Sequence, residues 1–583
     1  IILSAVRHHG WMRSSCIIHL TIVLALAHFL LMLGLIIGIK ILISLIWVIV
    51  HITLLIKLVH IIIVHVAHIL TICAHIIHLI LLKCLFHLVV CYCVLVTLCR
   101  LCRLCSHTKS SAVSHSFFIY LIIINMMLPY AEPFKIKMVE PIKLSTKEER
   151  KQYLKEAYFN PFLLESDKVL IDLLTDSGTS AMSAKQWAGI MQGDESYAGA
   201  RSWIRMRDTI MDLTGFKHIL PTHQGRAAER ILYGYLGGKG KTFISNTLFD
   251  TTRANIEFSG AEGIDIPIEE GKHPEVLHPF KGNMDVKKLE EIITEKGSDN
   301  IAGVILTVTN NSGGGQPVSM ENAKAVSEIC KKHHVKLYLD CCRIAENSYF
   351  VKHRESGFES TSYKEIAQQM FSLCDGAIMS AKKDALVNMG GFLAINDYEL
   401  NEKLQNLLII TEGFATYGGL SGRDMEAIAI GLNEVFEPDY LQYRIRSTAY
   451  LGDRLEKIGI PIMRPTGGHA VYIDAKALYP QIPLDEYPGQ ALVCNLYLEG
   501  GIRAVEIGSV MFGKYNKQHQ LIPASMELVR LAIPRRVYTK SHMDFVIEVF
   551  EKIWQHKDKA QGLKITYEQP FLRHFTAHFE SFI

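Results

Sequence analysis

The chain has 583 residues and a formal net charge of +3, but its charged residues are divided unevenly along the sequence. Residues 1–125 contain no Asp or Glu, eight Lys or Arg, 13 of the 26 His and eight of the 13 Cys. The remaining chain has 53 basic and 58 acidic residues, a net charge of −5, and no basic stripe or nucleic-acid motif, which argues against a nucleic-acid partner. Its roughly 455 residues are enough for two or three domains.

Residues 1–125 form an almost continuously apolar, His- and Cys-rich extension. Within it, residues 20–56 exceed the roughly 20 apolar residues that span a bilayer. Two interpretations stay open: a membrane anchor, or upstream sequence that is not part of the working protein. We favour the second, because the histidines follow no helical face and Met126 and Met127 stand just before an ordinary soluble composition. We therefore expect a cytoplasmic protein, with membrane association if the extension is genuine.

Cys99, Cys102 and Cys105 form a C-x2-C-x2-C run that superficially resembles a set of metal ligands. The repeating unit is Cys-Arg-Leu, and no paired cluster of ligands follows in the rest of the chain. We therefore predict low-complexity sequence rather than a metal site.

After residue 126, apolar runs of strand length alternate with amphipathic stretches of helix length, which predicts an α/β fold with a mostly parallel sheet. Asn311, Asp340 with Arg343, and Lys383 each follow a predicted strand. Ligands bind at the carboxyl ends of the strands in such sheets, so we expect these side chains to converge at one edge. The predicted strands are 304–309, 335–339 and 377–379, and the predicted helices are 321–333 and a segment near 361–372.

Lys383 and Asp340 together suit pyridoxal phosphate (PLP). This cofactor needs an amine for a Schiff base, a carboxylate that keeps its ring nitrogen protonated, and a cradle for its phosphate. The segment Thr222–Arg226 precedes a helical stretch, and the backbone N–H groups of a helix start, a glycine and an arginine make such a cradle. A solvated surface lysine is the alternative, but the aspartate and the glycine-rich flank 386–391 favour the Schiff-base lysine.

From about Ala131 to the C-terminus the sequence resembles the β-eliminating lyases of aromatic amino acids. The resemblance covers about 450 residues, and residues 1–125 have no counterpart in that family. It implies a PLP-dependent transferase fold of type I, like that of aspartate aminotransferase, with a large sheet domain and a smaller α/β domain. We expect an N-terminal arm with part of the small domain at 126–180, the large PLP-binding domain at 181–437 and the small C-terminal domain at 438–583. The matching stretches are Ile171–Gly178, Gly193–Tyr197, Pro221–Arg226, Gly315–Ser319, Ser380–Asp384 and Val529–Arg535.

The resemblance implies a role for each matching residue of the cofactor site. Lys383 forms the Schiff base, Asp340 pairs with the pyridine nitrogen and Phe249 stacks on the ring. Asn311 and Arg343 contact the side of the ring that carries the hydroxyl. The residues expected to hold the phosphate are Gln224, Gly225, Arg226, Ser380 and Lys382.

The resemblance also implies a substrate site for a small amino acid. Arg530 would bind the substrate carboxylate, since a guanidinium suits a planar bidentate partner, with Thr175 and Ser177 nearby. Tyr197 would be the general acid for the leaving group, contributed across a dimer interface. Family members are expected to be homotetramers built from dimers and to bind a monovalent cation such as K⁺. The positions that match the cation site are Gly178, Glu195 and Asn388.

Three positions separate family members that act on tryptophan from those that act on tyrosine. Asp250 replaces a threonine, Ile507 replaces the arginine that meets the phenol oxygen, and His574 replaces a phenylalanine. Without a cation the site settles a phenolate poorly, whereas Asp250 can accept the indole N–H. We therefore expect β-elimination of L-tryptophan to indole, pyruvate and ammonium. Elimination of tyrosine to phenol is the alternative, and a membrane-tethered binding module is the non-enzymatic one.

The expected mechanism assigns the proton transfers to named side chains. Lys383 removes the α-proton, while the cofactor ring, protonated against Asp340, accepts the electrons. Indole leaves poorly as a carbanion, so its C3 must first be protonated, and Tyr197 is the natural donor. Asp250 and His574 assist at the side of the indole nitrogen.

Overall fold

The computed structural model describes residues 23–28, 131–570 and 572–581. By its contacts the chain separates into Ile1–Met127 and Leu128–Ile583, and the second unit contains the sheets and the cavities described below. Residues 23–28 are helical and exposed. In the described ranges no helix has both the length and the apolar character needed to cross a membrane. The rest of the predicted span and the C-x2-C-x2-C run lie outside the described residues.

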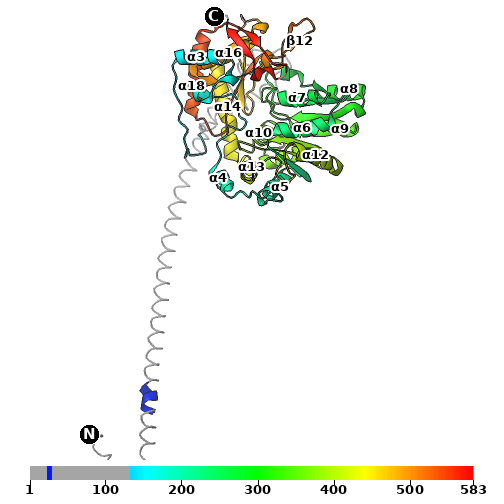
Figure 1. The fold of residues 1–583 in the computed structure, drawn as a ribbon, viewed down its shortest axis with the longest axis vertical. Coiled ribbons are helices and arrows are strands. Elements are labelled where there is room, and N and C mark those ends of the chain that lie inside the picture. The colour runs from blue at the N-terminus through cyan, green and yellow to red at the C-terminus, as the bar shows by residue number, and fades with distance from the viewer. Residues whose placement is uncertain (1–22, 29–130, 571, 582–583) are drawn as a thin grey trace, which may run out of the picture. The chain divides into compact units, whose positions relative to one another are not determined.

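Seven strands form the large sheet, in the order β2-β8-β7-β6-β5-β3-β4 (Figure 1). Strand β8 is antiparallel to both of its neighbours, whereas the other neighbouring pairs are parallel. The predicted α/β fold with a mostly parallel sheet is therefore confirmed. The strands are β2 (His218–Thr222), β3 (Thr242–Ser245), β4 (Glu262–Asp265), β5 (Ile301–Thr307), β6 (Leu337–Asp340), β7 (Gly376–Ser380) and β8 (Gly391–Ile395).

Side chains alternate between the two faces of this sheet, as the period of two in a strand requires. In β6, Leu337 and Leu339 join one buried cluster and Tyr338 joins the other. Both faces are covered by helices, which explains why the strands are apolar throughout. One layer contains α5 (Arg201–Thr214), α8 (Val286–Lys296), α9 (Met320–Lys332), α10 (Ile344–Arg354), α11 (Tyr363–Ser372) and α13 (Gly422–Glu434), and the other contains α6 (Gly225–Leu236), α7 (Asp250–Phe258) and α12 (Tyr398–Thr411).

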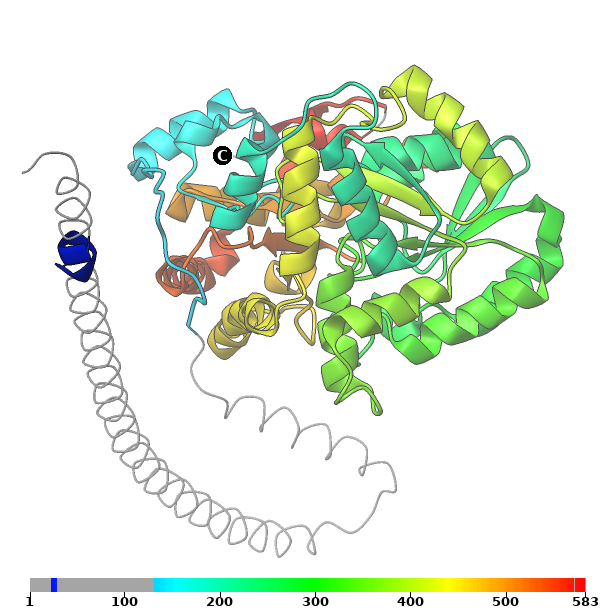
Figure 2. The same ribbon diagram turned by 90° about the horizontal axis from the view of Figure 1, so that it is seen from below.

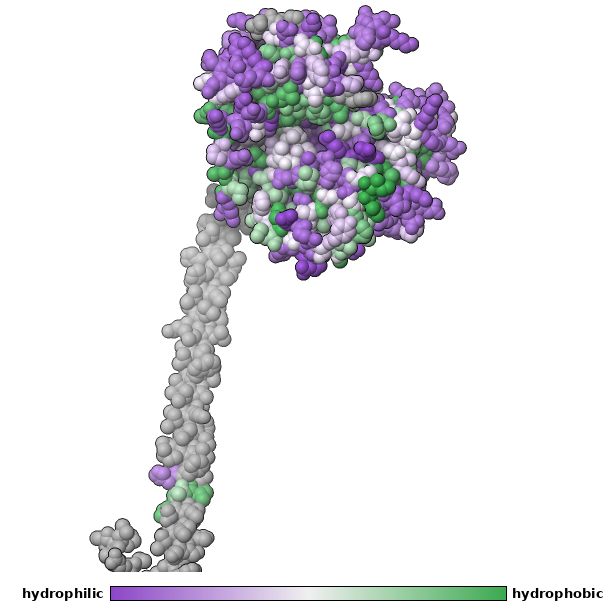
Figure 3. All heavy atoms as spheres, in the orientation of Figure 1, coloured by the Kyte–Doolittle hydropathy of each residue, from purple (hydrophilic) through white to green (hydrophobic). Residues whose placement is uncertain are grey.

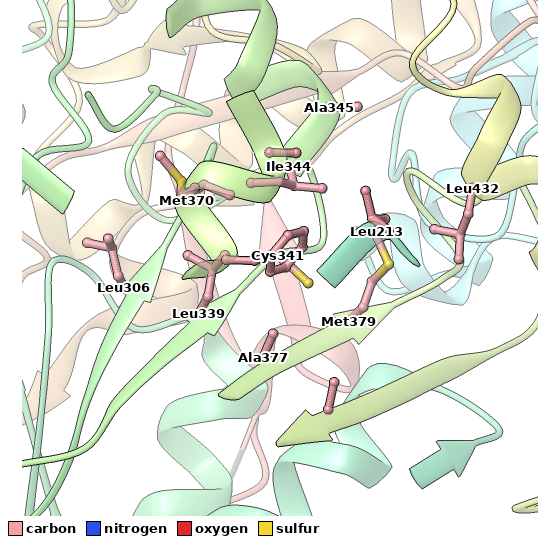
Figure 4. Packing of buried hydrophobic residues seen from close by; sticks show 14 of the residues in the cluster. Leu213, Leu306, Leu339, Cys341, Ile344, Ala345, Met370, Ala377, Met379 and Leu432 are labelled. Carbon is pink, nitrogen blue, oxygen red and sulfur yellow. The ribbon is translucent and has the colours of Figure 1, made fainter. Parts of the chain in front are cut away.

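Figure 4 shows part of the first layer at close range. Leu306, Leu339 and Met379, from three strands of the sheet, pack with Ile344 of α10 and Met370 of α11. Large aliphatic and sulfur-containing side chains of this kind fill irregular space between strands and helices.

Several of the helices begin where the sequence provides capping residues. Ser362 and Glu365 form a reciprocal capping box at the start of α11, and Ser421 with Asp424 does the same for α13. The helices predicted at 321–333 and near 361–372 correspond to α9 and α11, and each predicted strand overlaps an observed one. The differences of one to three residues at the ends are of the size expected from frayed termini.

A second, antiparallel sheet has the order β11-β14-β9. The long helix α14 contributes Ile445 to the core of the large sheet and Leu451 to the core of this second one, so it connects the two (Figure 2). Strand β1 pairs in parallel with β10, which ties the segment before residue 180 to the C-terminal region. The elements are α3 (Lys147–Glu156), β1 (Ile171–Asp172), α4 (Ala184–Met191), α14 (Pro438–Ile458), β9 (Ala470–Asp474), α15 (Ala475–Leu478), α16 (Pro488–Gly500), β10 (Ile502–Arg503), β11 (Val505–Ile507), α17 (Ser509–Phe512), β12 (Lys514–Tyr515), β13 (Leu521–Ile522), β14 (Leu528–Ala532), α18 (Lys540–Gln555), β15 (Leu563–Tyr567) and β16 (His578–Ser581).

Candidate active site

A cavity of about 250 Å³ lies where the parallel strands of the large sheet end. Asn311 follows β5, Asp340 ends β6, and Lys383 follows β7, and all three line this cavity. The second sheet contributes Arg530 from β14 to the same cavity, and the C-terminal segment contributes His574. The structure thus brings together residues that lie up to about 400 positions apart. The residues predicted for the site that line this cavity are Thr175, Ser177, Gln224, Gly225, Arg226, Phe249, Asp250, Asn311, Asp340, Arg343, Ser380, Lys382, Lys383, Arg530 and His574.

One end of the cavity is rich in positive charge and in backbone donors. Helix α6 begins at Gly225, and no side chain caps its first N–H groups. A Cβ at position 225 would lie 2.7 Å from the Cβ of Ser380, so only glycine fits here. Burial, followed by the charges of Lys383 and Arg226, lowers the pKa of Lys382. A helix start with converging cations is a site for a phosphate dianion.

Asp340 and Lys383 occupy the middle of the cavity. The Asp340 carboxylate accepts a hydrogen bond from the Cys342 backbone N–H at 3.2 Å. Within the described residues it has no ion pair, so this carboxylate is available to a protonated ring nitrogen. Lys383 is buried at the same wall. Cys342 lines the cavity and Cys341 is fully buried, and both are free thiols.

Arg343 is held mainly by other side chains of the protein. Its Nη2 donates to Oδ1 of Asn311 at 3.0 Å and to Oδ1 of Asp176 at 2.7 Å, and its Nε donates to Oδ2 of Asp176 at 3.0 Å. The structure therefore places Asn311 and Arg343 on the same side of the cavity, as the sequence predicts.

Arg530 has a donor without a partner. Its Nη2 donates to the backbone carbonyl of Leu174 at 2.8 Å, whereas its Nε is buried without a hydrogen bond. Thr175 and Ser177, which follow Leu174, line the same part of the cavity. An unsatisfied buried guanidinium N–H is costly, and a ligand carboxylate would satisfy it.

The other end of the cavity contains a carboxylate and an imidazole. Nε2 of His574 lies 3.3 Å from Oδ2 of Asp250, and both side chains are buried. Neither ring nitrogen of His574 has an aligned hydrogen bond, so both nitrogens retain capacity for a ligand. Ile507 lies elsewhere: it lines a neighbouring cavity of about 880 Å³, which shares Asp250 and Met511 with the first.

Besides Ile507, the predicted site residues that do not line this cavity are Tyr197, Glu195, Gly178 and Asn388. Tyr197 is 69% exposed and its ring packs against those of Phe414 and Tyr417, with centroid distances of 5.5 and 5.3 Å. Glu195 accepts hydrogen bonds from the backbone N–H groups of Gly422 and Arg423 at the start of α13.

The other two predicted cation ligands do meet. Nδ2 of Asn388 donates to the carbonyl of Gly178 at 2.9 Å. Glu195 takes no part in this contact within a single chain. The described part of the chain holds no group of three or more His, Cys, Asp or Glu residues arranged for a metal ion.

Sequence reasoning missed Glu229, which lines the cavity beside the phosphate end. It follows Arg226 by three residues on α6, a spacing that places the two on one helix face and could have identified it. Its carboxylate accepts hydrogen bonds from the hydroxyls of Thr251, at 2.9 Å, and Thr252, at 2.6 Å. Burial is the main reason that its pKa rises to about 7, and the charge of Asp340 adds to the rise. The apolar residues Phe162, Leu174, Val505, Met511 and Phe575 of the cavity wall were missed as well.

Comparison with known proteins gives consistent matches over this part of the chain. A family model described as β-eliminating lyase matches residues 172–549. The chain is 57% identical over 447 residues to a tryptophanase of Salinibacter ruber, covering 77% of this chain and 94% of that protein. It is 56% identical over 449 residues to a tryptophanase of Hyphomonas neptunium, covering 77% and 98%. It is 49% identical over 450 residues to a tyrosine phenol-lyase of Pasteurella multocida, covering 77% and 98%.

Proposed function

Because this chain belongs to the β-eliminating lyase family, we propose that it catalyses the PLP-dependent β-elimination of L-tryptophan to indole, pyruvate and ammonium. The observation that carries the choice of substrate is the buried contact between Asp250 and His574 in the same cavity as Lys383. The Asp250 carboxylate can accept a hydrogen bond from an indole N–H, whereas a carboxylate at this position disfavours a phenolate. The PLP-type-I fold is the one expected for this family.

The residues present fit PLP. The uncapped start of α6 with Arg226 and Lys382 would hold the phosphate, and the unpaired Asp340 carboxylate would face the ring nitrogen. When bound, PLP supplies an electron sink for the electrons of the substrate Cα–H bond. Phe249, directly before α7, would pack on the ring, and Asn311 with Arg343 would face the ring hydroxyl.

Arg530 orients the substrate by its carboxylate. The Nε of the guanidinium is free and its Nη2 is partly used, and Thr175 and Ser177 line the same cavity, so their hydroxyls can complete a carboxylate site. Anchoring this group fixes the Cα–H bond relative to the cofactor and to Lys383, which is the main contribution of positioning to the rate.

Lys383 accepts the α-proton in this proposal. Lys383 is buried and lines the same cavity as Asp340. An amine positioned at the reacting bond can act as a general base. Asp250 and His574 then hold the indole N–H while C3 is protonated.

Tyr197 protonates C3 from a second copy of the chain. This assignment is supported by the exposure of Tyr197 and by its absence from the residues that line the cavity of its own chain. Exposed apolar side chains lie on the helices next to it: Trp187 and Met191 on α4 and Ile204 on α5. Figure 3 shows apolar areas between polar ones on one face of the molecule. Such exposed apolar residues favour an interface between copies, and a homotetramer built from dimers is the proposed assembly.

A monovalent cation such as K⁺ completes the proposal. The Gly178 carbonyl and the Asn388 side chain, which meet in one chain, would supply oxygen ligands, and Glu195 would come from the neighbouring copy.

The domain boundaries near residues 180 and 437 are proposed on the separation of the two largest buried clusters. The cytoplasmic location stays a prediction.

Product analysis of the purified full chain with PLP and K⁺ tests the function. Tryptophan and tyrosine are supplied separately, and indole with pyruvate is expected from tryptophan. Phenol with pyruvate as the main product would overturn the choice of substrate. Lys383→Ala serves as the control and should release neither product and lose the visible absorbance of the bound cofactor.

A further inference from the structure

Six buried charged side chains form one cluster behind the cavity wall. The acids are Asp176, Glu346 and Asp384, the bases are Arg343, Arg444 and Arg535, and none is more than 3% exposed. The formal charges of this six-charge cluster balance. Buried charges are tolerated where each is paired and hydrogen-bonded, and here each one is.

Asp176 occupies the centre of the cluster. Its two carboxylate oxygens accept two hydrogen bonds from Arg343, at 2.7 and 3.0 Å, and Oδ2 accepts a third from Nη1 of Arg535 at 2.9 Å. Nη2 of Arg444 lies 3.5 Å from the same oxygen. The backbone carbonyl of Asp176 accepts a further bond from Arg535 at 3.1 Å. The residue therefore has fixed partners at both its side chain and its backbone.

The partners of Asp176 belong to the segments that form the two sides of the cavity. Asp176 itself does not line the cavity, but its neighbours Thr175 and Ser177 do. Arg343 follows Asp340 and contacts Asn311, on the cofactor side.

Arg535 extends the connection to the substrate side and to the lysine. It follows the strand β14 that bears Arg530, and its Nη2 donates to Oδ1 of Asp384 at 3.1 Å. Asp384 is the residue next to Lys383, and its Oδ2 accepts from the Ala345 N–H at 2.8 Å. The Asp384 carboxylate thus connects the segment that carries Lys383 to Arg535, which follows the strand of Arg530.

We propose that Asp176 is a positioning residue for the lyase reaction. It holds the Arg343 guanidinium against Asn311 and fixes the Thr175–Ser177 segment at a set distance from Arg530 and Lys383. This inference rests on the proposed function, which identifies the cavity as the active site. The contacts it uses all lie within this chain. Loss of the carboxylate frees Arg343 and Arg535 to move, and displacements of about 1 Å at a reacting centre weaken ligand binding and turnover by about 100-fold.

The test compares Asp176→Asn with Arg444→Met in the full chain. Arg444 belongs to the same cluster, bonds Glu346 at 2.9 Å and lines no part of the cavity, so it is a matched control for loss of one buried charge. Two affinities are measured: that of the apoprotein for PLP, and that of the PLP-loaded protein for L-alanine, which has the carboxylate and amine but no leaving group. The readout is the visible absorbance of the bound cofactor.

Asp176→Asn is expected to weaken both affinities by about tenfold or more, with Arg444→Met within about twofold of the parent protein. Equal effects of the two variants would assign Asp176 a merely structural role and overturn the proposal. If Asp176→Asn does not fold, Asp176→Glu replaces it, since it keeps the charge but lengthens the side chain and is expected to weaken L-alanine binding in the same direction. Failure of the parent protein to release indole would contradict the proposed function and leave the comparison of PLP affinities intact.

Discussion

Asp250 and His574 meet in the structure although 323 positions separate them: Oδ2 of the aspartate lies 3.3 Å from Nε2 of the imidazole. Asp250 begins α7, and His574 lies in a short C-terminal turn. Both side chains are buried, and both line the cavity that contains Lys383.

His574→Phe is expected to lower kcat/KM for tryptophan by about 100-fold, because it removes a polar group that acts during departure of indole. Asp250→Asn should cause a loss of similar size. Residues that act as a unit give non-additive losses, so the double variant should be little worse than either single variant. The rate of steady-state indole release is measured for the parent protein, the two single variants and the double variant. Losses that multiply would show that the two residues act independently.

Ile507→Arg is expected to reduce tryptophan turnover and to leave PLP binding intact. Ile507 is buried beside Met511 in the cavity that adjoins the cofactor site and shares Asp250 with it. A guanidinium there would pair with Asp250 and withdraw that carboxylate from the indole N–H. Combined with Asp250→Thr, the change should lower kcat/KM for tryptophan further and allow detectable phenol release from tyrosine. Unchanged turnover of tryptophan would remove position 507 from the residues that set specificity.

Lys281→Met is expected to destabilise the fold by about 3 kcal/mol, the scale of several unpaired buried polar groups. The buried ammonium donates to the carbonyls of His273 at 2.6 Å, Val276 at 2.9 Å and Arg464 at 2.9 Å. These carbonyls would lose their partner in the variant. Urea unfolding of the full chain measures the change. The exposed Lys272, changed in the same way, should have an effect below about 0.5 kcal/mol.

Glu506→Gln is expected to flatten the dependence of stability on pH. Burial, with the neighbouring charge of Glu527, raises the pKa of Glu506 to about 8. The folded protein therefore retains a proton between about pH 4.5 and 8 that the unfolded chain releases, so this group's contribution to stability falls as pH rises through that window.

The measurement is the free energy of unfolding of both proteins at pH 5 and pH 9. The decrease in the free energy of unfolding from pH 5 to pH 9 should be smaller in the variant than in the parent protein by about 2 kcal/mol or more. Lys476 and Asp474 face Glu527 and are left unchanged. The control is Glu548→Gln, at an exposed position. An equal change of stability with pH in Glu506→Gln and in the parent protein would contradict the raised pKa of Glu506.

Sequence alone identified the family, the fold class and most of the cavity. The family membership predicted from the motifs is confirmed by the family model and by relatives at 56–57% identity. The approach of Asn311, Asp340 and Lys383 to one another could be predicted because parallel strands place their carboxyl ends at the same edge of a sheet. Local periodicity and short motifs are sufficient for statements of this kind.

Only the tertiary structure decided the contacts between segments that no local pattern connects. The bidentate contact of Asp176 with Arg343 spans 167 positions, and the single hydrogen bond from Arg535 to the same carboxylate spans 359. The hydrogen bonds that the Glu229 carboxylate of α6 accepts from Thr251 and Thr252 of α7 likewise depend on how these two helices pack. Such contacts depend on how complete domains pack. Two opposite charges attract each other strongly only after both have been removed from water, and no short segment of the sequence can bury them on its own.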